Sequence, residues 1–284
     1  MSIDGGALLL CLAVSLGAAL VVLLATFAVG VRTGLHRHVD TAWGLAFCAV
    51  AGTAYGLSAG HGNDGRRLLV LLLVVAWGLR LSAHIWLRGR GRGEDPRYAR
   101  LLGRVPAERR SGYALRIVYL LQAGLVWLVS LPVQVAVFVP RPPGALAWTG
   151  TVLWSSGLFF EAVGDQQLRR FRADPANLGQ VLDRGLWHCT RHPNYFGDFL
   201  VWWGLFLCAA DTPVGWATVV SPLVMSCLLI NGSGKPMLER QLRSTKPGYA
   251  AYVDRTSGFL PLPPRTGRSG IFGGSRKQPV RQER

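Results

Sequence analysis

Charged residues and paired cysteines are both scarce in this sequence of 284 residues. Asp, Glu, Lys and Arg together make up 16% of it, and its 5 cysteines show no regular spacing. The cysteine pattern excludes a disulfide framework and a zinc-binding motif. The 6 histidines form no ligand-spaced group with a carboxylate, so we expect no metal site. No segment has the composition of a separate soluble domain, which leaves a chain organised around its apolar runs.

The apolar runs are long enough to cross a bilayer, which takes about 20 mostly apolar residues per helix. We predict an all-α polytopic membrane bundle of about seven transmembrane helices within one domain, residues 1–262. The first run lacks a basic n-region and is expected to be a retained helix rather than a signal peptide. The sixth is short and is expected to be lengthened by the residues before it. The predicted spans are residues 7–29, 41–59, 68–87, 114–139, 146–163, 196–210 and 214–230.

The excess of basic residues, a net charge of +16, is distributed unevenly around these spans. Of 31 Lys and Arg residues, 9 lie in 88–116, 5 in 165–194 and 11 from 231 onward. With seven spans these regions share one side, which the positive-inside rule makes cytoplasmic, with the N-terminus outside. Contact with anionic membrane lipids is expected, whereas nucleic-acid binding is not, since no such module is present. Residues 263–284 are predicted to form a basic disordered cytoplasmic tail.

Two polar segments stand out beside the apolar runs. Asp165, Arg169 and Arg172 share one face of a helix that continues the fifth span. They fit either an Asp–Arg pair on a solvated face or two guanidiniums presented to phosphates. The second segment is RHPNYFGD, residues 191–198, in which Pro193 suits the first position of a helix. Its polar residues indicate a site, although an aromatic belt at the membrane interface explains its tyrosine and tryptophan neighbours equally well.

Polar side chains also lie within or beside spans two and three. Arg80, His84 and Arg88 form a stripe at i, i+4 and i+8, and Arg88 is able to reach the cytoplasmic surface. Arg80 and His84 need a partner such as Asp40 or Glu161, which is compatible with a structural buried ion pair or with a site. Asp40 precedes the second span and also suits a helix N-cap.

Five motifs together resemble the steroid 5α-reductase-like membrane family, and are most similar to a bacterial branch with an RHPNYFG-type motif. The resemblance runs in order from about residue 38 to residue 262 and therefore covers most of the chain. The motifs are VDTAWG at 39–44, WGLRL at 77–81, RGRGEDPRY at 90–98, Asp165 with Arg169 and Arg172, and RHPNYFGD at 191–198.

This resemblance implies an integral-membrane NADPH-dependent oxidoreductase acting on CH–CH groups, in the multi-pass setting of a bacterial inner membrane. The reaction would reduce a carbon–carbon double bond conjugated with a ketone in a lipophilic, steroid- or isoprenoid-like substrate. Asp40 and His84 would be catalytic, His84 lying near the position of the family's helix-three tyrosine, which this chain lacks. We expect them to hold the ketone away from the cofactor clamp. The expected cofactor-binding residues are Asp165, Arg169, Arg172, Arg191, His192, Asn194, Tyr195, Asp198, Trp202 and Glu239.

A second class of enzyme remains open. Isoprenylcysteine and phospholipid methyltransferases are similar membrane enzymes with an Arg-His-Pro-x-Tyr segment, a later glutamate and a Tyr-x-x-Tyr. On that interpretation Arg191, His192, Tyr195 and Glu239 would bind S-adenosylmethionine, although this chain has Glu239-Arg240 where those enzymes have two glutamates. A non-catalytic transporter or lipid-binding scaffold is the third interpretation, and no inverted repeat supports it.

Overall fold

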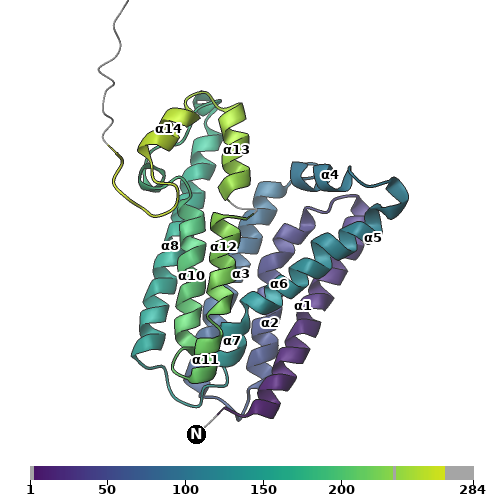
Figure 1. Cartoon of the computed structure of the whole chain (residues 1–284), viewed down its shortest axis with the longest axis vertical. Helices are drawn as coiled ribbons and strands as arrows, with labels where there is room; N and C mark the ends of the chain where they lie inside the picture. Colours follow the sequence, from purple (N-terminus) through teal and green to yellow (C-terminus); the bar gives the residue numbers. More distant parts are fainter. Residues whose placement is uncertain (1–2, 233–234, 266–284) are drawn as a thin grey trace, which may run out of the picture.

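The structure is a computed structural model that describes residues 3–232 and 235–265. Within these residues the chain is all-α, as predicted, with one isolated bridge between Thr190 and Ser257 and no strand. The longest helices run beside one another along one axis (Figure 1). Residues 266–284 of the predicted tail lie outside the described residues.

The first half of the chain forms three long helices followed by a broken one. They are α1 (Gly5–Thr33), α2 (His38–Leu57), α3 (Asp64–Gly89), α4 (Pro96–Leu102), η1 (Ala107–Arg109), α5 (Arg110–Ala114), the π-helical η2 (Leu115–Leu120), α6 (Leu121–Val129) and α7 (Leu131–Ala136).

The second half adds two long helices packed on each other and a set of shorter ones. They are α8 (Ala145–Ala173), η3 (Pro175–Asn177), α9 (Leu186–Cys189), α10 (Pro193–Ala209), α11 (Pro213–Ala217), α12 (Val220–Ile230), α13 (Lys235–Thr245) and α14 (Tyr249–Arg255).

Among the described residues, four helical segments are long and apolar enough to cross a membrane: Gly5–Thr33, Asp64–Gly89, Ala107–Val129 and Pro213–Ile230. Many large apolar side chains on them are exposed, as expected for a surface that faces lipid. The chain therefore has the features of a multi-pass membrane protein. The count of seven spans remains a prediction.

Helices α8 and α10 extend as the sequence indicates. Helix α8 continues past the apolar fifth run to Ala173, and it carries Asp165 and Arg172 with it. Helix α10 begins at Pro193, so residues before the sixth apolar run lengthen it to 17 residues. Proline is tolerated at this first position because its missing N–H would have no helical partner there.

Glycines let α8 and α10 approach closely. A Cβ atom added to Gly157 on α8 would lie 2.5 Å from the carbonyl oxygen of Gly197 on α10, and the reverse holds for Gly197. Small residues at such positions allow two helix backbones to touch. This contact fixes the register of the two helices and places Glu161 and Asp165 beside Asn194 and Asp198.

The two ends of the bundle differ. The N-terminus lies at one end, and α4, α13 and α14 lie at the other (Figure 1). We call α13, α14 and the following residues to Leu262 the cap, because they sit beside the ends of α8 and α10.

Candidate functional site

A large cavity opens at the capped end of the bundle. Its volume is about 540 Å³, within the range of roughly 300–1,000 Å³ typical of small-molecule sites. Residues of α2, α3, α4, α8, α10 and α13 line it. Of the predicted site residues, the cavity wall contains Asp40, His84, Asp165, Arg172, Asn194, Tyr195 and Asp198.

Arg80 links two carboxylates across α3 and α8. Its Nη2 lies 2.9 Å from Glu161 Oε2 and 2.9 Å from Asp165 Oδ2. Glu161 also accepts a hydrogen bond of 2.9 Å from Trp77 Nε1. The predicted pairing of Arg80 with Glu161 is confirmed, and Asp165 is its second partner. Because Arg80 and Trp77 on α3 bond to carboxylates on α8, this network holds α3 against α8 beneath the cavity.

His84 lies on the same wall as the predicted cofactor residues. Its Nε2 is 3.6 Å from Asp165 Oδ2, and Asn194 Nδ2 donates a hydrogen bond of 3.4 Å to Asp165 Oδ1. The sequence-based expectation placed His84 with Asp40, apart from the cofactor clamp. The structure instead joins His84, Asp165 and Asn194 in one cluster.

Asp198 belongs to the cavity wall and has one buried oxygen, Oδ1, without a hydrogen-bond partner among the described residues. A buried polar atom of this kind is costly unless a ligand or water satisfies it. Trp202, one turn further along α10, is fully buried against Trp77 and Phe47 and does not reach the cavity. Trp202 therefore supports the wall from behind.

Asp40 is held by α4 instead of capping its own helix. Helix α2 begins at His38 with Arg37 as its N-cap residue, so the N-cap interpretation of Asp40 is wrong. The hydroxyl of Tyr98 donates to Asp40 Oδ1 at 2.6 Å, and Arg97 Nη2 lies 2.5 Å from Oδ2. Burial and the Asp40 carboxylate raise the pKa of Tyr98. Both oxygens of Asp40 are thus occupied, and it fixes α4 at the cavity edge.

The mouth of the cavity is cationic. Arg88, Arg92 and Arg172 line it, and the positive charges of the first two act on Arg172. None of the three has an ion-pair partner among the described residues. Carboxylates line other parts of the same cavity, among them Glu94 and Asp95. The three arginines without ion-pair partners nevertheless supply guanidinium groups, whose geometry matches phosphate.

Arg169 lies outside the cavity wall, although its positive charge acts on His84. The sequence predicts that Asp165, Arg169 and Arg172 share one functional face, but Arg169 is exposed and lies outside the wall of the cavity. The other guanidinium groups at the mouth belong to Arg88, at the end of α3, and to Arg92, which lies just beyond that helix. In the sequence, Arg88 belongs to the polar stripe of the third span and Arg92 to the RGRGEDPRY motif at 90–98, and neither was predicted to bind the cofactor.

Arg191, His192 and Glu239 bind one another. Arg191 Nε donates to Glu239 Oε1 at 2.9 Å, and His192 Nε2 lies 3.1 Å from the same oxygen. Arg191 also donates to the carbonyls of Thr256 and Val253 at 2.5 and 3.1 Å. All three side chains are buried, and none lines the large cavity. We call this trio the latch, because it ties α10 to the cap.

The contacts within the latch shift the pKa values of Glu239 and His192. Burial opposes ionisation of Glu239, but the hydrogen bonds from His192 and Arg191 outweigh it and lower the pKa of Glu239 to about 2. Burial also lowers the pKa of His192, against the attraction of Glu239. The ring of His192 stacks on Tyr195 with centroids 5.2 Å apart. Because Tyr195 lines the cavity, the latch and the cavity wall are mechanically connected.

Comparison with known proteins places this chain in a family. A family model described as "Protein of unknown function (DUF1295)" matches residues 26–256, and the chain belongs to that family. It is also similar to an uncharacterised protein of Schizosaccharomyces pombe, with 24% identity over 261 residues that cover 82% of this chain and 74% of the relative. No solved structure matches the chain.

Proposed function

We propose that this member of the DUF1295 family is an integral-membrane, NADPH-dependent reductase of a carbon–carbon double bond conjugated with a ketone. Its substrate is lipophilic and steroid- or isoprenoid-like. The cavity at the capped end of the bundle is the site of the reaction.

The observation that carries this proposal is the composition of the 540 Å³ cavity. Arg88, Arg92 and Arg172 line it without an ion-pair partner among the described residues, and such guanidinium groups suit the pyrophosphate of a dinucleotide. Asn194 and Asp198 line the same cavity, and amide and carboxylate groups pair with a carboxamide or a ribose hydroxyl. The residues present therefore fit a dinucleotide along the length of the cavity.

Some of the protein residues bind the cofactor, and His84 stabilises the charge that develops on the substrate. Arg88, Arg92 and Arg172 bind the phosphates, while Asn194 and Asp198 orient the nicotinamide end. When bound, NADPH supplies the hydride that reduces the β-carbon of the enone. His84 donates a hydrogen bond to the ketone oxygen and stabilises the negative charge that develops there. A proton is then taken up at the adjacent carbon.

The location suits a lipophilic substrate and a soluble cofactor. Leu81, Ile85 and Leu168 provide apolar surface in the cavity wall, between helices whose outer faces are apolar. On the positive-inside rule the capped end faces the cytoplasm and the N-terminus faces outward. NADPH then enters from the cytoplasm, and the substrate enters from the bilayer.

The methyltransferase interpretation has less support from the same geometry. The residues it requires, Arg191, His192 and Glu239, are bonded to one another within the latch and do not line the large cavity.

Thermal unfolding of the purified protein, titrated with NADPH and with S-adenosylmethionine, tests the proposal. We expect NADPH to raise the melting temperature, because a ligand that binds only the folded state stabilises it. Arg172→Gln should weaken NADPH binding about tenfold, the effect of losing one charge-assisted hydrogen bond. Arg170→Gln is the matched control, since Arg170 is exposed on the same helix and lines no cavity. Stabilisation by S-adenosylmethionine alone would overturn the proposal.

A further inference from the structure

A group of four exposed arginines follows α4, at the end of the bundle that carries the cap (Figure 1). None of the four has an ion-pair partner among the described residues. We call them the basic patch: they are Arg104, Arg109, Arg110 and Arg116. The one acid between residues 103 and 116 is Glu108, which is itself exposed. The positive charge of the patch is therefore not balanced by an acid that the structure describes.

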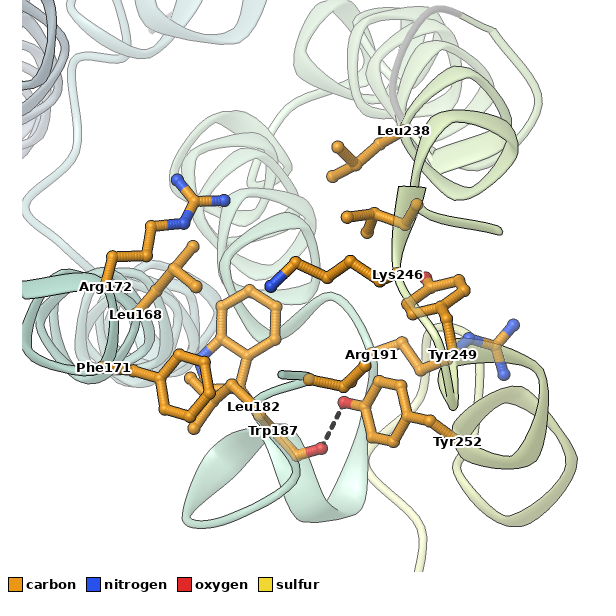
Figure 2. Close-up of a pocket in the computed structure, with 12 residues that line it drawn as sticks. Leu168, Phe171, Arg172, Leu182, Trp187, Arg191, Leu238, Lys246, Tyr249 and Tyr252 are labelled. Carbon is orange, nitrogen blue, oxygen red and sulfur yellow. Dashed lines mark hydrogen bonds between the residues drawn. The ribbon is translucent and has the colours of Figure 1, made fainter. Parts of the chain in front are cut away.

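Several other basic residues at the capped end are engaged within the protein. Arg172, Arg191 and Lys246 line a small chamber of about 70 Å³ between α8, α9 and the cap (Figure 2). Arg191 is bonded within the latch, and Lys246 donates to the carbonyl of Gln180. The arginines of the basic patch differ from these because their side chains lie on the outer surface, where a partner from outside the chain can contact them.

Apolar side chains attach the segment that carries the patch to the bundle. Leu102 at the end of α4 and Ala114 in α5 are buried and belong to the main hydrophobic core. Tyr98 on α4 is buried as well, and its hydroxyl donates to Asp40 in the wall of the large cavity. The same segment therefore carries the basic patch on its outer side and positions one edge of the cavity through α4.

The patch is continuous with the exposed apolar surface of the membrane-crossing segment Ala107–Val129. Arg116 immediately precedes Ile117, whose side chain is 42% exposed. Arg109 and Arg110 lie roughly 10 Å further along a helix that rises about 1.5 Å per residue. The polar layer of each leaflet is about 5–8 Å thick, and charges act over about 8 Å at physiological ionic strength. If Ile117 faces lipid, the patch is thus within reach of the headgroup charges.

We propose that the basic patch binds acidic phospholipids of the leaflet at the capped end, and that this contact holds α4 in place at the edge of the cavity. The partner follows from the unbalanced positive charge of the patch and from its continuity with an apolar surface. Each arginine near an anionic membrane surface strengthens the attraction by a factor of about five. The inference concerns the position of α4 and does not depend on the reductase activity.

Hydrogen exchange of the full-length protein in lipid nanodiscs tests the inference, because it reports local opening element by element. One preparation contains phosphatidylcholine alone, and the other contains equal parts of phosphatidylcholine and phosphatidylglycerol. We expect the backbone amides of α4 to be protected about tenfold more strongly in the mixture, while the protection of α8 is unchanged. Salt at about 1 M should remove the difference, since it screens exposed charges.

Substitutions in the patch separate its charge from the rest of the segment. The combined change Arg104→Gln, Arg109→Gln and Arg110→Gln should abolish the tenfold increase and leave the protection of α4 in pure phosphatidylcholine as it was. Lysine at the same three positions should retain the increase, because the attraction to an anionic surface depends on charge. Loss of the increase with lysine would contradict an electrostatic contact with the leaflet.

A matched control removes three exposed arginines from the same end of the bundle. Arg170→Gln, Arg240→Gln and Arg243→Gln combined lie outside both cavities and outside the patch, and should leave the increase intact. If α4 is protected equally in the two membranes, or if this control variant also loses the increase, the inference fails. Either result leaves the reductase proposal standing, because cofactor binding is measured separately.

Discussion

Replacing Glu239 by glutamine should open the cap without unfolding the bundle. The substitution removes the negative charge that Arg191 and His192 share, and leaves the Arg191 guanidinium buried with only carbonyl partners. Removing one partner of a buried ion pair costs about 3–5 kcal/mol. Glutamine keeps one acceptor oxygen, which places the expected loss at the lower end of that range.

The pKa of Glu239 gives an independent magnitude. Its fall from 4.5 to about 2 corresponds to roughly 3 kcal/mol, at about 1.4 kcal/mol per unit. A loss of about 3 kcal/mol raises the population of the open cap about 100-fold.

Hydrogen exchange with mass spectrometry is the appropriate assay, because it reports local opening element by element. Protection of α13 and α14 should fall about 100-fold in Glu239→Gln, while α2 and α3 remain unchanged. Glu108→Gln is the matched control, since Glu108 is exposed and forms no ion pair in the described residues. Unchanged protection of α13 would show that the latch does not hold the cap.

The pH dependence of cap protection should follow from the same group. A carboxylate whose pKa is lower in the folded state stabilises that state above its unfolded pKa. The stabilisation by Glu239 is therefore present at neutral pH and is lost as the pH falls from about 4.5 toward about 2. His192 acts in the same direction, because its lowered pKa disfavours protonation in the folded state. In Glu239→Gln the acid-dependent loss should be smaller, and an identical loss would refute the assignment.

Two further substitutions test the site and the packing that positions it. His84→Phe should abolish turnover and leave NADPH affinity unchanged, measured by steady-state kinetics and equilibrium binding, and normal turnover would exclude His84 from the reaction. Gly197→Ala should cost about 1–3 kcal/mol by forcing α8 and α10 apart, measured by thermal unfolding. Gly124→Ala has open space around the new methyl group and should not destabilise the protein, and equal effects would refute the packing argument.

The helices were largely predictable because their signals are local. Apolar runs defined the long helices, Pro193 marked the start of α10, and polar residues with helical spacing extended α8 to Ala173. The wrong prediction of an N-cap at Asp40 shows that local sequence signals do not reveal contacts between distant segments. Asp40 is an acceptable cap on propensity alone, but Tyr98 and Arg97 from α4 occupy both of its oxygens. That contact joins residues 57 and 58 positions apart, and no local pattern encodes it.

The site was predictable only in part for the same reason. Helical spacing identified Asp165 and Arg172 as neighbours on α8, but it did not say which helix would face them. The choice depends on the close contact of Gly157 and Gly197, which sets the register of α8 against α10. With that register Asp165 meets Arg80, His84 and Asn194, and Arg169 is left exposed.

The division of the RHPNYFGD segment follows from its proline. A residue before proline is driven out of the helical region, and His192 has φ −140° and ψ 61°. Arg191 and His192 therefore leave the helix axis and turn toward the cap, whereas Asn194 and Asp198 follow Pro193 on successive turns that face the cavity. The eight consecutive residues are thus divided between the latch and the cavity wall. Because His192 stacks on Tyr195 across this break, release of the latch should disturb the cavity wall, which couples opening of the cap to the site.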